Sequence, residues 1–477
     1  MIANKAVLLS RAALMAFACS MWASAQGAAV VTIVNNNAPN EGFNDPTPVQ
    51  PVGGNTGTTL GQQRLIAFQH AAGIWGATLS SNVPVRVGAS FVPLACTADT
   101  AVLGSAGAND IFSDFPNAPR PNTWYPSALA SKLAGADQAP DGEPHIRARF
   151  NSRLGLFPDC MPGSGFYLGL DNKHGDKINL VTVLLHEMAH GLGFQGFTDE
   201  QTGEPYEKRP SVWDHHLIDN RSNKLWVNMN NDERRVSALS ETGLSWNGEF
   251  VTGQVPTVLS PQSTMTVSGR RAGAAKGAYE VGDASFGPPL DLAGVKGELM
   301  RVVDQANGTG LACAALSAAN AAAVKGNIAL VDRGECSFVV KAKFVQDAGA
   351  RGMVVADNAP GPVTGLGGGD PSIAIPAVRI SVAAGTALKA VLKKRARGKT
   401  GIEANLTIDP DRLAGTDSMR RIRMFVPAEF DPGSSVSHFT TDAKLNQLME
   451  PSINADLIHE VKAPRDLTQA LLQDIGW

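Results

Sequence analysis

The sequence predicts an α+β protein in which a second, α/β domain interrupts the first. In the first half, short strand and loop patterns surround one strongly apolar helix. From about residue 265 the pattern changes to alternating strands and helices, and near residue 410 it returns to loops and a last helix. The chain has 477 residues, enough for two or three domains. We therefore divide it into residues 26–260, an insert at 265–410, and residues 411–477, which complete the first domain.

Residues 1–25 have the pattern of a cleaved export signal. Lys5 and Arg11 supply positive charge, residues 12–22 are a short apolar run, and Ala23-Ser24-Ala25 matches a cleavage site. No later stretch stays apolar for about 18 residues, so we expect no membrane span after signal removal. The sequence thus predicts a secreted or periplasmic protein.

Four cysteines remain after the predicted signal: Cys96, Cys160, Cys313 and Cys336. An even number in an oxidising compartment predicts disulfides. Three pairings are open, and proximity within each domain favours Cys96–Cys160 and Cys313–Cys336. No C-x-x-C spacing exists, so we expect no zinc site made of cysteines.

The charge pattern excludes one class of partner. The formal net charge is −3 and no basic patch is present, so we expect no nucleic-acid binding. The composition gives no indication of the oligomeric state.

The first half contains one amphipathic helix and several short strand candidates. Thr59 and Gln62 match a capping box at a helix start. Most of residues 100–144 are predicted to be loop. The apolar stripe of this helix consists of Leu65, Phe68, Ala72, Trp75 and Leu79. The strand candidates are residues 29–34, 85–92, 146–150 and 166–170.

A second helix is apolar on nearly every face, which predicts that it is buried. We expect Asp176 to cap it and the glycines Gly191 and Gly193 to end it. Its apolar stripe is Ile178, Val181, Leu185, Met188 and Leu192. Ionisable residues interrupt this helix, and buried ionisable groups are costly unless they are paired or bound to metal.

These residues are His186-Glu187-Met188-Ala189-His190. Positions i and i+4 share one helix face, so His186 and His190 can direct two imidazoles at one metal ion. Glu187 can then take a proton from a water at that ion. The alternative is a pair of hydrogen-bonded core histidines.

A catalytic zinc uses three protein ligands, so a third ligand must lie elsewhere. The contiguous metzincin pattern requires His at position 196, where this chain has Gly196. Asp214 is the main downstream carboxylate candidate for the third ligand. Weaker candidates are His215, His216, Glu200, Glu204 and Glu207.

Residues 186–194, HEMAHGLGF, resemble the active-site helix of leishmanolysin-type metzincins. In that family an insertion precedes the third histidine, and a turn containing methionine follows it. Downstream, Ser437-His438-Phe439 precedes Leu448-Met449-Glu450-Pro451. The resemblance implies that His438 is the third zinc ligand and Met449 the Met-turn methionine, with Phe439 where tryptophan is usual. It also implies a metzincin-like zinc protease domain.

A second resemblance lies in the insert. Residues 327–338, NIALVDRGECSF, followed by Lys341-Ala342, residues 348–350 and residues 353–355, resemble a protease-associated (PA) domain. In that family the domain is non-catalytic and lies beside a protease active site. Asp332-Arg333-Gly334 would then be a strand-to-helix turn.

Together these features predict a secreted zinc endopeptidase acting on protein or peptide substrates. Zn²⁺ would be bound by His186, His190 and His438, with Glu187 as general base. The strand near residues 166–170 could pair with an extended substrate, although no substrate-binding side chain is identified. The alternative is a non-catalytic secreted binding protein with a degenerate metal site and a PA recognition module. We expect little or no propeptide.

Overall fold

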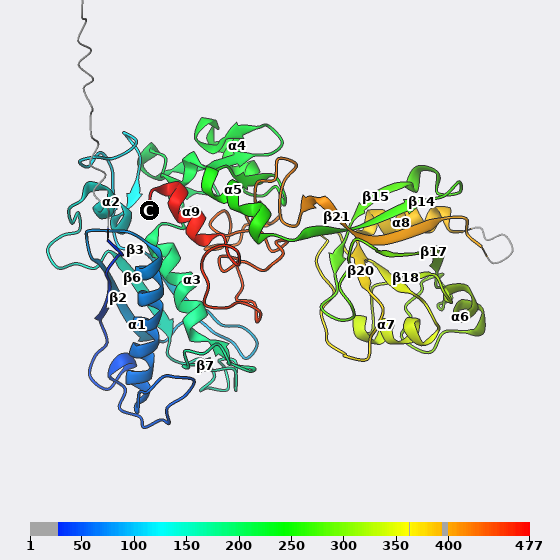
Figure 1. The fold of residues 1–477 in the computed structure, drawn as a ribbon, viewed down its shortest axis with the longest axis horizontal. Coiled ribbons are helices and arrows are strands. Elements are labelled where there is room, and N and C mark those ends of the chain that lie inside the picture. Colours follow the sequence, from blue (N-terminus) through cyan, green and yellow to red (C-terminus); the bar gives the residue numbers. More distant parts are fainter. Residues whose placement is uncertain (1–26, 362, 394–398) are drawn as a thin grey trace, which may run out of the picture.

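The computed structural model describes residues 27–361, 363–393 and 399–477. The predicted signal, residues 1–25, lies outside the described residues. Figure 1 shows two bodies joined by a pair of strands. None of the helices in the described ranges is long and apolar enough to cross a bilayer.

The first body contains a four-stranded sheet with the order β1-β2-β6-β3. Strands β1 (Val31–Asn35), β2 (Val85–Val92) and β6 (Ile146–Asn151) are parallel, and β3 (Gly104–Ala108) is antiparallel at the edge. The prediction of mostly loop over residues 100–144 was wrong at β3 and at helix α2 (Ser127–Ala134), and the short strands β4 (Ile111–Phe112) and β5 (Tyr125–Pro126) also lie there. The β3 sequence Gly-Ser-Ala-Gly-Ala lacks β-branched and aromatic residues, so only pairing with β6 makes it a strand.

Two helices lie against this sheet and against each other. Helix α1 (Leu60–Thr78) begins with the expected capping box of Thr59 and Gln62. Helix α3 (Leu180–Leu192) is tied to it by Trp75, whose Nε1 donates to the Leu185 carbonyl at 3.2 Å. The cap of α3 is Asn179, whose side chain accepts from the N–H groups of residues 181 and 182. The prediction of Asp176 as the cap was therefore wrong.

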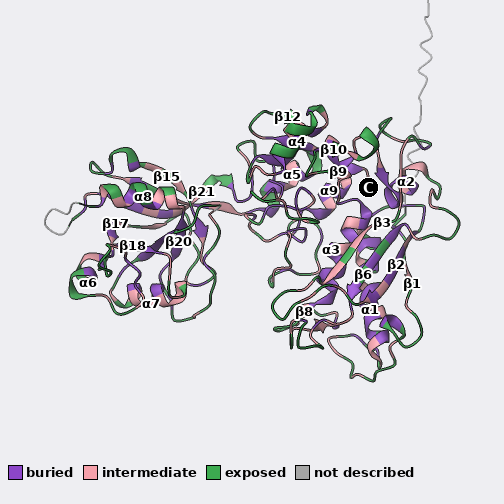
Figure 2. Cartoon of the chain, turned by 180° about the vertical axis from the view of Figure 1, so that it is seen from behind, coloured by how far each residue is buried: buried purple, intermediate pink, exposed green. Residues whose placement is uncertain are grey.

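The rest of the first body consists of short elements over one core. This core includes apolar residues from 29–259 and from 413–475, so the two outer segments pack together. Figure 2 shows the buried interior of this body. The remaining elements are β4 (Ile111–Phe112), β5 (Tyr125–Pro126), α2 (Ser127–Ala134), β7 (Phe166–Tyr167), β8 (Ile178–Asn179), β9 (Thr198–Asp199), β10 (Glu204–Pro205), β11 (Leu217–Asp219), β12 (Lys224–Leu225), α4 (Asn231–Ser237), β13 (Leu244–Trp246), α5 (Glu249–Val258) and α9 (Thr468–Ile475), with short 3-10 turns between them.

The second body is built on an eight-stranded sheet with the order β15-β14-β21-β17-β18-β19-β20-β16. Its centre, from β17 to β20, is parallel. Two separate apolar clusters fill this body. Its elements are β14 (Pro261–Ser268), β15 (Gly277–Glu280), β16 (Gly282–Asp283), β17 (Val295–Arg301), α6 (Ala318–Val324), β18 (Ile328–Asp332), α7 (Phe338–Asp347), β19 (Gly352–Ala356), β20 (Ala377–Ile380), α8 (Val382–Val391) and β21 (Glu403–Leu413).

The chain enters and leaves the second body at adjacent points. Strands β14 and β21 pair antiparallel, with Pro261 opposite Leu413. Beyond the strands, the N–H of Ala414 donates to the Ser260 carbonyl at 3.0 Å. An ion pair between Lys444 and Asp283 also joins the two bodies.

Each body contains one disulfide. Cys96 is bonded to Cys160 and Cys313 to Cys336, which confirms both predicted pairings.

Candidate metal centre

Three histidines from distant parts of the chain converge on one point. Nε2 of His186 lies 3.2 Å from Nε2 of His190 and 3.2 Å from Nε2 of His438. The first two come from successive turns of α3, and the third from the segment after the second body. The group is the only set of three or more potential metal ligands found in the described part of the chain. The structure therefore brings together the three side chains that the sequence singled out.

Backbone carbonyls orient all three rings in the same way. Nδ1 of His186 lies 2.8 Å from the Leu448 carbonyl, and Nδ1 of His190 lies 2.7 Å from the carbonyl of Phe194. Nδ1 of His438 lies 2.9 Å from the Ser434 carbonyl. A carbonyl only accepts, so each Nδ1 carries the proton and each Nε2 presents a lone pair to the common point. This donor set fits a zinc ion.

The rings are neutral at physiological pH. Burial lowers the pKa of His186 to about 3 and that of His190 to about 4. Burial, with the neighbouring histidines, also holds the pKa of His438 well below its usual range. Neutral imidazole is the form that binds metals, so these rings need not lose a proton first.

Glu187 lies beside the cluster and is tied to the edge strand β3. Its Oε2 accepts a hydrogen bond of 2.8 Å from the Ala106 N–H. Burial raises the pKa of Glu187 to about 7, although this N–H acts in the opposite direction. The carboxylate is therefore held in place at the one sheet edge that lies along α3.

Met449 forms part of a buried turn next to the histidines. Its side chain is fully buried, and its carbonyl accepts from the Phe439 N–H at 2.8 Å. The Phe439 ring packs edge-on against Phe194, with ring centroids 5.0 Å apart. The turn thus contacts the segment that carries His438.

The competing candidates for the third ligand lie outside the cluster. Asp214 is buried, and its Oδ2 accepts from the Ser211 N–H, the Ser211 hydroxyl and the Thr198 hydroxyl. His215 contacts the Thr123 hydroxyl at 3.2 Å, and His216 stacks on Trp246. Asp214 therefore fixes its own loop. Glu200, Glu204 and Glu207 are also absent from the three-histidine group found among the described residues.

The strand predicted near residues 166–170 is shorter in the structure, and its pairing with substrate stays a prediction. Only Phe166–Tyr167 is a strand there, and β7 already pairs with β8. The strand at the sheet edge beside α3 is β3. Its sequence lacks the alternating apolar residues by which a strand can be recognised.

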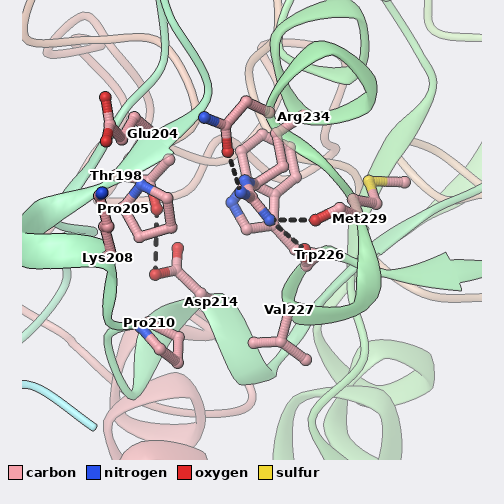
Figure 3. A pocket seen from close by; sticks show the side chains of 11 residues that line it. Thr198, Glu204, Pro205, Lys208, Pro210, Asp214, Trp226, Val227, Met229 and Arg234 are labelled. Atoms are coloured by element: carbon pink, nitrogen blue, oxygen red, sulfur yellow. Dashed lines mark hydrogen bonds between the residues drawn. The ribbon is translucent and has the colours of Figure 1, made fainter. Parts of the chain in front are cut away.

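A polar cavity of about 490 Å³ lies in the segment between α3 and α5. Figure 3 shows Arg234 directed at the carbonyls of Trp226 and Met229, and Thr198 bonded to Asp214. No histidine of the metal cluster lines this cavity. It is a feature separate from the candidate metal centre.

Hydrogen bonds and an ion pair hold the predicted Asp332-Arg333-Gly334 turn of the second body. Strand β18 ends at Asp332, whose Oδ2 accepts from the Gly310 N–H at 2.9 Å. Arg333 pairs with Asp357 at 2.9 Å. These contacts hold the strand-to-helix connection together.

Comparison with known proteins identifies part of the second body. The PA domain family model matches residues 295–388, which confirms the PA resemblance within the insert. No curated protein matches the chain.

Solved structures give partial matches. The zinc aminopeptidase BSAP from Bacillus subtilis is 22% identical, over 33% of this chain and 36% of that one, with a TM-score of 0.22. An aminopeptidase from Aneurinibacillus sp. strain AM-1 is 20% identical over 42% of each chain, with a TM-score of 0.22. The subtilisin-like protease Apa1 from Pseudoalteromonas sp. AS-11 is 18% identical over 31% of this chain and 33% of that one, with a TM-score of 0.22. The chain thus covers less than half of each of these structures, and the PA domain is the part whose family is identified.

Proposed function

We propose that this protein is an exported zinc-dependent peptidase whose metal ligands are His186, His190 and His438. The observation that carries the proposal is the convergence of their three Nε2 atoms, each ring held by a carbonyl at Nδ1. A bound zinc ion would supply Lewis-acid polarisation of a peptide carbonyl and lower the pKa of water. The two disulfides are consistent with export.

Glu187 acts as the proton carrier in this proposal. Its carboxylate takes a proton from the attacking water and passes it to the leaving amine. The Ala106 N–H holds Oε2 in position for both transfers.

The finer proposal is an endopeptidase of the metzincin type. It is supported by the resemblance of residues 186–194 and by the buried turn at Met449. The substrate would lie extended along β3. The Ala106 N–H points away from β6, so in an antiparallel strand Gly104 and Ala108 also direct their backbone groups to that outer edge.

Metal analysis and peptidase assays test this proposal. We expect the purified protein to contain one zinc per chain and to cleave casein, with activity lost to a chelator and restored by Zn²⁺. An internally quenched peptide blocked at both ends should also be cleaved, which an aminopeptidase would not do. Zinc-free, inactive protein would instead favour a non-catalytic binding protein with a PA recognition module.

A further inference from the structure

Asp466 is a buried carboxylate to which the proposed chemistry gives no role. It is 2% exposed, and no ion pair to it is found among the described residues. The adjacent Arg465 pairs with Asp456 instead, at 3.2 Å. Burial raises the pKa of Asp466, so keeping this group inside the protein costs free energy. Such a cost indicates that the carboxylate has a specific task.

The two oxygens of Asp466 accept from two backbone N–H groups. Oδ2 lies 2.6 Å from the nitrogen of Leu448, and Oδ1 lies 2.8 Å from that of Thr468, the first residue of α9. A second bond runs the opposite way, because the Leu467 N–H donates to Oε1 of Gln447 at 3.0 Å. Residues 466–468 and the turn at 447–449 are therefore joined by two reciprocal side chain-to-backbone bonds.

These two bonds, from Leu448 to Asp466 and from Leu467 to Gln447, form what we call the staple. The turn that the staple holds contacts His186 and the residue next to His438. The Leu448 carbonyl accepts a hydrogen bond of 2.8 Å from Nδ1 of His186. The Met449 carbonyl accepts from the N–H of Phe439, the residue after His438, at 2.8 Å. The position of one turn thus sets both the His186 ring and the backbone next to His438.

We propose that Asp466 is a positioning residue of the metal centre, which fixes the Leu448–Met449 turn and through it the imidazoles of His186 and His438. This inference rests on the proposed function. Both oxygens accept from backbone N–H groups, which suits the ionised carboxylate, and hydrogen bonds to charged groups are about twice as strong as neutral ones. Partners of metal ligands typically change metal affinity or activity by about 10–100-fold when they are removed.

The test compares Asp466→Asn with a matched control, Asp474→Asn. Asp474 lies in α9, the helix that begins two residues after Asp466, and it accepts from Trp246 Nε1 and two backbone N–H groups. No bond from Asp474 to the turn is found among the described residues. Zinc affinity is measured by competition with a chromogenic chelator. The cobalt-loaded protein is compared by its visible absorption spectrum.

We expect D466N to bind zinc about 10–100-fold more weakly than the wild type, with an altered cobalt spectrum and a lower kcat at similar KM. D474N should bind zinc within about 2-fold of the wild type and keep its cobalt spectrum. Equal zinc affinity and equal spectra in D466N and wild type would overturn the inference while leaving the peptidase intact. A wild-type protein that neither binds zinc nor cleaves peptides would instead overturn the proposed function, and this inference with it.

If D466N does not fold, a milder variant can test the same inference. Gln447→Met removes the second bond of the same staple and leaves Asp466 in place. We expect a smaller loss of zinc affinity in the same direction. Unchanged zinc affinity and an unchanged cobalt spectrum in Q447M would contradict the inference.

Discussion

The Ala106 N–H in the edge strand β3 donates a hydrogen bond of 2.8 Å to Oε2 of Glu187 in helix α3. This bond joins the edge of the sheet to the carboxylate that follows His186 in α3. Any shift of the strand would therefore change the position of the proposed general base.

Replacing Ala106 with proline tests the importance of this bond. Proline removes the N–H but is tolerated on an edge strand whose N–H faces outward. We expect Ala106→Pro to lower kcat by about 10–100-fold while zinc content stays at the wild-type value. Ala106→Ser keeps the N–H and serves as the control. Equal kcat in both variants would show that the bond does not position Glu187.

Removing His438 tests the assignment of the third ligand. We expect His438→Ala to weaken zinc binding by more than about 100-fold, beyond the range typical of residues that contact ligands only indirectly. His215→Ala should leave zinc affinity unchanged, because His215 contacts Thr123 and lies outside the cluster. The measurement is zinc competition at constant pH. A larger loss in His215→Ala than in His438→Ala would reverse the assignment.

Glu187→Gln separates metal binding from catalysis. The amide has a similar shape but cannot take a proton from water, so we expect a full zinc content and a loss of activity of about 10²–10⁴-fold. Zinc analysis and cleavage of denatured casein measure the two effects. Normal cleavage by this variant would rule out Glu187 as the general base.

Glu450 should make the stability of the protein depend on pH. Its side chain is 2% exposed, and burial raises its pKa to about 8. The negative charges of Asp456 and Asp466 also raise this pKa, whereas hydrogen bonds from Gln447 and Asn454 lower it. The folded state therefore favours the protonated acid, and stability falls as the pH rises from about 4.5, the ordinary value, to about 8.

The variant Glu450→Gln removes this titration. We expect its stability relative to wild type to increase by on the order of 5 kcal/mol between pH 4.5 and pH 8, and then to level off. Urea unfolding of both proteins with a chelator present measures the difference without a contribution from bound metal. A difference that does not vary with pH would show that Glu450 titrates normally.

The two disulfides should stabilise separate parts of the molecule. The cysteines of Cys96–Cys160 are 64 residues apart and those of Cys313–Cys336 are 23 apart. Chain entropy then gives about 4 kcal/mol for the first and about 3 kcal/mol for the second. We expect Cys313→Ser with Cys336→Ser to lower the unfolding midpoint of the PA-containing body while zinc affinity is unchanged. A loss of zinc binding in that double variant would show that the two bodies unfold together.

Several features could be predicted from the sequence because their signals are local. His186, Glu187 and His190 lie within one helical turn, and the capping box of Thr59 and Gln62 spans one turn as well. The PA resemblance rests on a continuous stretch of residues, which the family match at 295–388 confirms. His438 was identified through a family resemblance, since nothing local distinguishes it from an exposed loop histidine.

The features that were missed depend on tertiary contacts. Strand β3 has small, flexible residues and is a strand only because β6 and α3 lie beside it. The cap at Asn179 was hidden because Ile178 belongs to a two-residue strand and not to the helical stripe. Asp466 carries no motif, and its role is visible only when Leu448 and His186 are placed in space.

The adjacency of Ser260 and Ala414 means that the PA-containing body is a removable appendage in topological terms. A short reverse turn could replace everything between these two residues without changing the path of the remaining backbone. Natural variation or engineering could therefore shorten, exchange or delete this module while the first body, with its three imidazoles, folds as before.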